Sequence, residues 1–133
     1  MVRSSGTYNT DYSSHPILLQ INCPLEFLRF NIEGRGRVSI WDTPHYEFWG
    51  SDTGKEDYKK YICQYYGSEQ VETSFSKFES LPNFLDKEPE INCLLGRVIE
   101  PWSDWLLIVD GNHRAALAAH RKESTLKVFI TDR

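Results

Sequence analysis

The stretch WLLIVDGNHRAALAAH, residues 105–120, decides the fold because its pattern changes in the middle. Its first half is an apolar run of the kind that forms a buried strand. Its second half is rich in alanine and predicts a helix that begins at Asn112. Asp110 and Gly111 lie between the two halves, so we expect a tight turn there. The segment therefore predicts a strand, a turn and a helix in direct succession.

The rest of the chain contains further strands and helices that can pack against this segment. Apolar and β-branched runs predict strands, and apolar residues spaced three or four apart predict helices. The runs 92–100 and 105–111, joined by turn-forming residues, are expected to pair antiparallel. This mixture is typical of an α+β or α/β domain, of which we favour α+β, a mixed sheet with packed helices. Further strands are expected at 16–23, within 34–42 and at 126–132. Helices are expected at 55–67 and from 71 up to Pro82, with one helical turn within 24–30. A loop is expected at 43–54.

The length of the chain, 133 residues, leaves room for one domain with one core. Residues 1–14 are rich in Ser, Thr, Asn and Tyr without periodicity, which predicts a flexible N-terminal arm before a single domain at 15–133. The sequence has no apolar run long enough for a membrane span and no secretory signal. We therefore expect no membrane partner and a cytoplasmic location.

Charge and cysteine content exclude several classes of function. The 15 Lys and Arg residues against 19 Asp and Glu give a net charge of -4, which disfavours broad binding to nucleic acid. The three cysteines, Cys23, Cys63 and Cys93, are far apart and odd in number. They form neither a metal-ligand motif nor a disulfide framework, so we expect reduced residues in or near the core.

The turn at residues 110–114 has the chemistry of an anion site. A helix start leaves several backbone N–H groups unpaired, and the helix dipole makes that end positive. Gly111 permits a close approach by a ligand, and the amides from Gly111 and Asn112 onward point toward it. Arg114 can hold phosphate oxygens through its planar fork, and His113 can donate a hydrogen bond or a proton near neutral pH. Phosphate is the anion that fits best.

Asp110 has two possible roles beside a phosphate. It either caps the helix, or holds Arg114 or a Mg²⁺ ion in place. The structural alternative is that Asp110 only caps, His113 is a surface residue and Arg114 makes an ordinary ion pair. Local spacing does not separate these possibilities, since Asp-Gly before a helix is common.

The segment IVDGNHRAALA, followed by a short strand, resembles the ParB N-terminal domain and sulfiredoxin superfamily. It is most similar to members with an Asp-Gly-His-His-Arg motif, including free-serine kinases, with Asn112 here in place of the first His. The resemblance covers about the last third of the chain. It implies a small α+β domain whose turn and helix bind nucleotide phosphates. It also implies a Glu acting as a base near the first strand, where Glu26 lies in this sequence.

The sequence departs from two branches of this superfamily. No helix-turn-helix follows the motif, which disfavours the DNA-clamp role of ParB. The motif lacks the cysteine of sulfiredoxin, which disfavours sulfinic-acid reduction.

A second constellation lies in WDTPHYEFW, residues 41–49. His45 is a candidate general acid or base, and Asp42 a candidate to orient it, in a loop that forms a pocket wall. The alternative is that Pro44 shapes a turn and the aromatic residues pack into a small core.

These features together predict a nucleotide-phosphate-binding domain that performs phosphoryl transfer or nucleotide hydrolysis with Mg²⁺. The nucleotide is expected to be ATP, ADP or CTP, held by His113, Arg114 and the helix amides. Asp110 is the candidate metal ligand, and Glu26 or His45 the candidate base. The alternatives are a non-catalytic module that senses a nucleotide or phosphate, a DNA-associated ParB-like protein of a mobile element, and a domain that has lost activity.

Overall fold

A computed structural model of the chain describes residues 17–87, 93–99 and 105–131. Its centre is one mixed sheet of six strands in the order β1-β6-β4-β5-β2-β3. Parallel pairs join β2 to β5 and β4 to β6, whereas the other neighbours are antiparallel. The α+β prediction with a mixed sheet is confirmed. The strands are β1 (Ile17–Pro24), β2 (Leu28–Ile32), β3 (Gly36–Val38), β4 (Cys93–Val98), β5 (Leu106–Asp110) and β6 (Thr125–Thr131).

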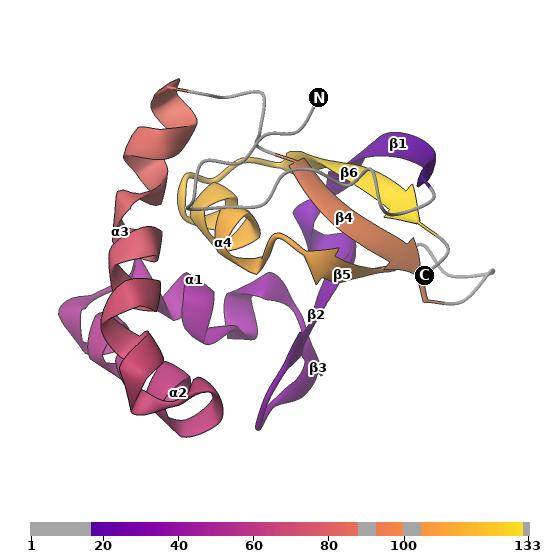
Figure 1. Cartoon of the computed structure of the whole chain (residues 1–133). Coiled ribbons are helices and arrows are strands. Elements are labelled where there is room, and N and C mark those ends of the chain that lie inside the picture. Colours follow the sequence, from indigo (N-terminus) through magenta and orange to yellow (C-terminus); the bar gives the residue numbers. More distant parts are fainter. Residues whose placement is uncertain (1–16, 88–92, 100–104, 132–133) are drawn as a thin grey trace.

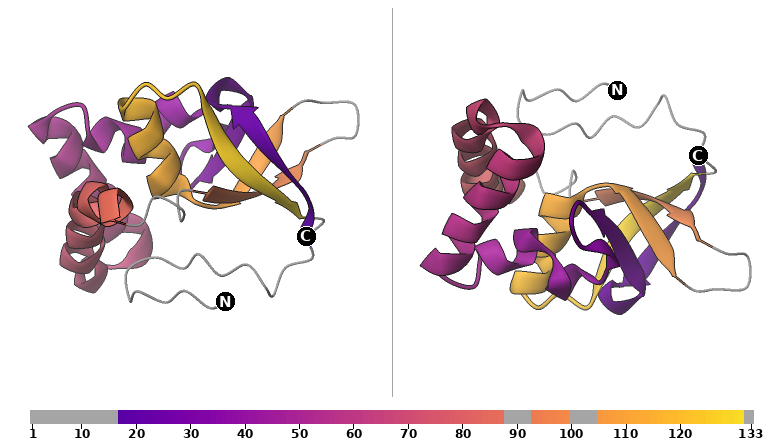
Figure 2. Two further views of the ribbon diagram at one scale, coloured as in Figure 1. Left: turned by 90° about the horizontal axis from the view of Figure 1, so that it is seen from above. Right: turned by 90° about the horizontal axis from the view of Figure 1, so that it is seen from below.

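The helices gather on one side of this sheet, as Figures 1 and 2 show. In the view of Figure 1, α4 lies between α3 and the sheet. Residues 115–119 of α4 are all buried, and four of these five are alanines, whose small side chains let the helix pack closely among its neighbours. The helices are α1 (Pro44–Phe48), α2 (Asp52–Tyr66), α3 (Val71–Lys87) and α4 (Asn112–His120), with short 3-10 turns η1 (Leu25–Phe27), η2 (Ile40–Asp42) and η3 (Ser68–Gln70).

The strand, turn and helix expected from residues 105–120 are present as β5, Gly111 and α4. The expected strand at 16–23 is β1, and the expected antiparallel pair is β4 with β5. Strand β2 was not expected as such, since only a helical turn was predicted in that region. The turn exists as η1, but the chain extends again at Leu28 and β2 pairs with β5 in the sheet.

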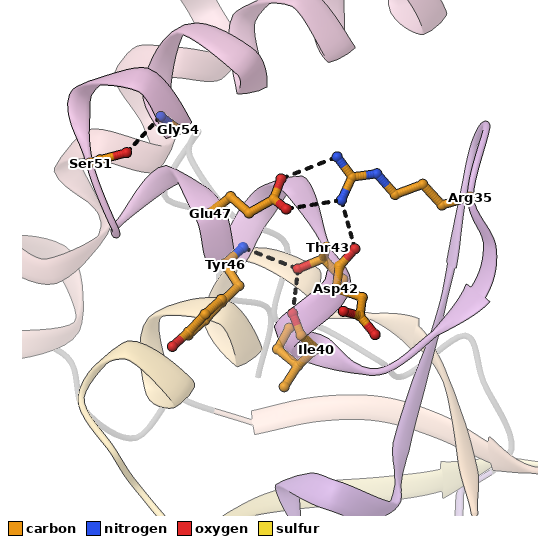
Figure 3. A network of polar contacts seen from close by, with 8 residues as sticks. All are labelled: Arg35, Ile40, Asp42, Thr43, Tyr46, Glu47, Ser51 and Gly54. Carbon is orange, nitrogen blue, oxygen red and sulfur yellow. Dashed lines mark hydrogen bonds and ion pairs between the residues drawn. The ribbon is translucent and has the colours of Figure 1, made fainter.

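The expected loop at residues 43–54 was wrong, because it contains α1 and the start of α2. Figure 3 shows the two capping contacts that start these helices. The Thr43 hydroxyl accepts a bond from the Tyr46 amide at 3.1 Å, and the Ser51 hydroxyl accepts one from the Gly54 amide at 3.0 Å. Thr43 before Pro44 is therefore a helix start rather than a plain turn.

The second predicted helix was expected to end at Pro82, but α3 continues through it to Lys87. A proline within a helix removes one backbone hydrogen bond and strains the preceding turn. Phe78, Leu81 and Leu85 are all buried on either side of Pro82 and form one apolar stripe along α3. Burial of this stripe offsets the cost of the proline, so tertiary packing sets the end of the helix.

Several predictions fall on residues that the structure does not describe. The expected N-terminal arm at 1–14 and the turn between β4 and β5 at 100–104 lie outside the described residues. Of the cysteines, Cys23 is buried as expected, whereas Cys63 is exposed on α2, so its predicted place in or near the core was wrong. Within the described part of the chain, no helix has the length and apolar character to cross a membrane.

Candidate functional site

The turn between β5 and α4 is made by Gly111, whose φ of +121° is a conformation that side-chain-bearing residues rarely adopt. A Cβ atom added there would lie 2.3 Å from Cδ2 of the buried Leu94, so the position also lacks space for a side chain. As the N-cap of α4, Gly111 offers no side-chain acceptor to the first amides of the helix. The start of α4 therefore has no side-chain cap.

This turn lies at the edge where two parallel strands end. Leu28 of β2 is opposite Leu106 of β5, and the strands run in the same direction. The residue after β2, Glu33, therefore reaches the same edge as Gly111, which follows β5. Ligands of sheets with parallel strands commonly bind beyond the carboxyl ends of those strands.

A groove of about 430 Å³ opens beside the first residue of α4. It is lined by Asn112 of the motif, by the exposed Arg97 of β4 and by Glu33. We call it the α4 groove; its lining is Asn31, Glu33, Tyr66, Arg97, Leu107, Ile108, Val109 and Asn112.

Glu33 is a candidate site residue that the sequence analysis missed. The Tyr61 hydroxyl donates to its Oε2 at 2.5 Å, and the Tyr66 hydroxyl donates to its Oε1 at 2.9 Å. The bond from Tyr61 is the main cause that holds the pKa of Glu33 below its usual value. The residue is thus a fixed, ionised carboxylate. No local pattern marks it, since its partners are 28 and 33 positions further along the chain.

Arg114 does not face the α4 groove. Its side chain is only 2% exposed, and its Nη2 lies 3.3 Å from Oδ2 of Asp110. A guanidinium held in this way fixes the end of β5 to the first turn of α4. The structure therefore corrects the expectation that Arg114 binds phosphate oxygens directly, because the group is buried and already paired.

His113 points into the helical layer rather than toward solvent. Its Nε2 is 2.9 Å from the hydroxyl of Tyr58, and its ring packs edge-on against Phe78 at 4.6 Å between centroids. Burial, with a smaller effect from Arg114 and Lys77, lowers the pKa of His113 to about 4. The ring is neutral at pH 7, which corrects its expected role as a proton donor near neutrality.

His45 lies directly beside His113, although the two are far apart in the sequence. Their ring centroids are 4.7 Å apart in an edge-to-face arrangement. His45 is 4% exposed, and its Nδ1 makes no hydrogen bond within the described part of the chain. Burial lowers its pKa well below the usual value, with His113 adding to the effect. His45 therefore packs in a small aromatic core, as the second alternative from the sequence expected, and it contacts His113 of the motif.

The pocket wall expected at residues 41–49 exists, but His45 does not line it. Trp41, Tyr46 and Glu47 border a separate hollow of about 510 Å³ on the outer side of α1. Asp42 accepts a bond from the Ser39 hydroxyl and does not orient His45 through any hydrogen bond in the described structure.

Glu26 lies at the wrong end of the sheet to act at the turn. It belongs to η1, which precedes β2, whereas Gly111 lies beyond the carboxyl end of the neighbouring β5. The adjacent Leu25 amide donates to the carbonyl of Ser124, in the segment after α4 has ended. The full length of α4 therefore separates Glu26 from the motif, and the structure does not bring the two together.

Asp110 was the candidate ligand for Mg²⁺. One of its oxygens faces Arg114, while its side chain remains 46% exposed. The described residues hold no cluster of three His, Cys, Asp or Glu side chains that would bind a metal by themselves. Mg²⁺ is commonly held by only one or two carboxylates together with phosphate oxygens, so Asp110 or Glu33 fits an ion that arrives with a nucleotide.

The lowered pKa values of His45 and His113 predict that the protein loses stability in mild acid. The folded pKa of His113, about 4, lies below its ordinary 6.5, so the unfolded chain takes up the proton first. The contribution is complete above pH 6.5 and is lost as the pH falls toward 4. We expect His113 alone to lower the free energy of unfolding by about 2 kcal/mol between pH 7 and 5, measured by urea titration. His113→Gln should reduce this dependence and exposed His120→Gln should not; an unchanged dependence in His113→Gln would contradict the assignment.

Comparison with known proteins adds no relative to this geometry. No family model matched the chain, and neither a curated protein nor a solved structure matched it. The likeness to the ParB and sulfiredoxin superfamily thus rests on the motif at residues 108–118 and stays a prediction.

Proposed function

We propose that the α4 groove binds the phosphates of a nucleotide, and that the protein transfers or hydrolyses a phosphoryl group with Mg²⁺. The observation that carries this proposal is the start of α4, which has no side-chain cap and opens on a groove that also contains Arg97. The positive end of a helix dipole attracts a phosphate, and a nearby guanidinium adds a planar pair of donors. The similarity of the motif to phosphate-binding turns supports the same function.

The proposal gives each residue at the α4 groove a separate role. The Asn112 amide and its neighbours hold one phosphate, and Arg97 takes the place that the sequence suggested for Arg114. Arg114 positions the turn through Asp110. Glu33, a carboxylate fixed by two tyrosines, holds the Mg²⁺ ion or orients the acceptor hydroxyl. Bound Mg²⁺ would supply charge neutralisation at the phosphates. Phosphoryl transfer depends mainly on positioning and electrostatics, so a strong base is not needed.

A thermal-shift panel with ATP, ADP, CTP and GTP in the presence of Mg²⁺ tests the proposal. At a ligand concentration of roughly 100 times Kd, binding adds about 2.7 kcal/mol, or roughly 10 °C in Tm for a chain of this size. We expect this rise in the parent protein with at least one nucleotide and its loss in Arg97→Ala. Arg121→Ala, an exposed arginine at the far end of α4, is the matched control and should keep the shift. The proposal fails if no nucleotide raises the Tm of the parent.

A binding module without turnover is the second candidate. The observation that favours it is the state of the motif side chains, since Asp110 and Arg114 are paired and His113 is neutral. Glu33→Gln separates the two candidates. If the protein is an enzyme, this variant loses turnover of labelled nucleotide; the nucleotide shift remains if Glu33 orients the acceptor and weakens if Glu33 holds the Mg²⁺ ion. If the parent shows the shift but no turnover, the module is supported.

A further inference from the structure

The outer face of the sheet, opposite the helices, carries a separate set of basic residues. Side chains alternate between the two faces of a strand, and the set packed into the main core includes Leu28, Phe30, Ile108 and Val128. The alternate positions face outward and include every Lys and Arg of the described strands. We call these four the outer-face cations: Arg29, Arg37, Arg97 and Lys127.

The strand register places three of these cations close together. Arg97 on β4 is opposite Leu107 on β5, which is opposite Arg29 on β2. Neighbouring strands are about 4.8 Å apart, so the Cα atoms of Arg97 and Arg29 are roughly 10 Å apart. Arg37 is opposite Asn31 on the next strand, β3. Arginines therefore lie on three of four adjacent strands, β4, β2 and β3, with the buried Leu107 of β5 between Arg97 and Arg29.

Among the described residues, the outer-face cations differ from other cations in their partners. Arg37, Arg97 and Lys127 are exposed, and none makes an ion pair with a carboxylate of the described residues.

By contrast, several cations elsewhere are paired, including Arg35 with Glu47 and Arg121 with Asp86. The one acidic residue within the described strands is Asp110, which is paired with Arg114. Glu33 lies at the margin of the face, bound by Tyr61 and Tyr66. The described residues carry 13 Lys and Arg against 13 Asp and Glu, so their charges balance, and the four outer-face cations make the strands locally basic.

Apolar surface lies among the same cations. Trp105 and Val109 are each 45% exposed, and the Arg29 guanidinium lies 4.1 Å from the centroid of the Trp105 ring. Arginines suit phosphate oxygens, and exposed apolar groups suit bases that are not hidden in a duplex. An acidic peptide could pair with the cations, but its carboxylates would make no favourable contact with the apolar Trp105 and Val109.

We propose that the outer face of the sheet binds single-stranded nucleic acid, with its phosphates on the outer-face cations and its bases toward Trp105 and Val109. The net charge of -4 predicts weak binding for the surface as a whole. It does not describe this face, where positive charge is segregated. Arg97 and Val109 also line the α4 groove, so the two proposed ligands would share part of one surface, whereas Arg37 and Lys127 belong to the outer face alone.

Fluorescence anisotropy with a labelled single strand of about 20 nucleotides tests the proposal. We expect binding at roughly 50 mM salt that weakens steeply toward 200 mM, because the phosphate contacts release counterions. In the double variant Arg37→Ala/Lys127→Ala the slope of log K against log salt should fall by about 1.4, and affinity at 50 mM should drop on the order of 50-fold. The double variant Lys60→Ala/Lys87→Ala removes the same charge from exposed positions of α2 and α3 and should lose far less.

Three results would overturn the proposal: no binding at low salt, equal losses in the two double variants, or equally tight binding of a poly-glutamate peptide. Neither Arg37 nor Lys127 lines the α4 groove, so the first double variant should retain any nucleotide thermal shift. Failure of nucleic-acid binding and failure of nucleotide binding are therefore distinguishable.

Discussion

Arg114→Ala is expected to lower the free energy of unfolding by about 4 kcal/mol, the largest loss that we predict for a motif residue. Arg114 is among the largest fully buried side chains and is 2% exposed. Its removal opens a cavity next to the core and leaves Asp110 without its cation. Asp110 is partly exposed, so water recovers some of its solvation, and the cavity accounts for most of the loss.

Urea unfolding of Arg114→Ala and Arg97→Ala at pH 7 measures this effect. The two variants make the same chemical change, but Arg97 is exposed on β4 and should change stability by less than about 0.5 kcal/mol. Equal stability of the two variants would show that Arg114 is not the structural residue described above. Arg114→Met keeps most of the buried volume and should recover part of the loss.

Gly54→Ala is expected to destabilise the fold by about 3 kcal/mol, although alanine is the better helix former. A Cβ atom at Gly54 would lie 1.8 Å from the carbonyl oxygen of Glu47 and 2.7 Å from its carbonyl carbon. Both are backbone atoms, so α1 and α2 must move apart. Figure 3 shows Gly54 at the start of α2, bound to Ser51.

Gly50→Ala is the matched control for this variant. Its added Cβ would meet the same Glu47 oxygen at 3.4 Å, an ordinary contact, and Gly50 is exposed. Thermal unfolding should show a large drop in Tm for Gly54→Ala and little change for Gly50→Ala. A Tm for Gly54→Ala at or above that of the parent would contradict the close approach of α1 to α2. Because His45 belongs to α1, the same shift would also disturb its contact with His113.

Local patterns predicted the parts of the fold that local forces determine. The change from an apolar run to an alanine-rich segment at Gly111 placed β5, the turn and α4, and α2 ends before Gly67 as expected. Thr43 before Pro44 is a local signal for a helix start, although a loop was predicted there. The end of α3 could not be found from Pro82, because the buried stripe beyond the proline depends on contacts with other elements.

The sequence pointed to one of the residues that line the α4 groove and missed the others. The motif at 110–114 does lie beside a groove, yet only Asn112 lines it. The burial of Arg114 and the partial burial of His113 follow from how α4 packs on α1 and α3, which no spacing in the motif reveals. Glu33 and Arg97 reach the groove because β2, β5 and β4 are neighbours in the sheet. Strand order is a property of the whole fold, so these residues could not be identified from the sequence.

The buried motif residues and the open groove belong to one arrangement. Arg114 and Asp110 fix the geometry of the turn, and Gly111 provides the backbone conformation that leaves α4 without a side-chain cap. A preorganised anion site needs groups that hold its backbone rigidly, and the buried, paired Arg114 would hold this turn in that way. Substitutions of the buried residues should thus act through stability, and substitutions of Arg97 and Glu33 through the ligand.

Amide chemical shifts measured by nuclear magnetic resonance during titration with Mg²⁺ and the best nucleotide of the panel test the central claim most directly. If the start of α4 holds a phosphate, the amides of Asn112 and His113 shift among the most strongly, and they stop responding in Arg97→Ala. If a nucleotide binds while these amides stay in place and the changes gather elsewhere, the turn before α4 is a structural element and not the phosphate site.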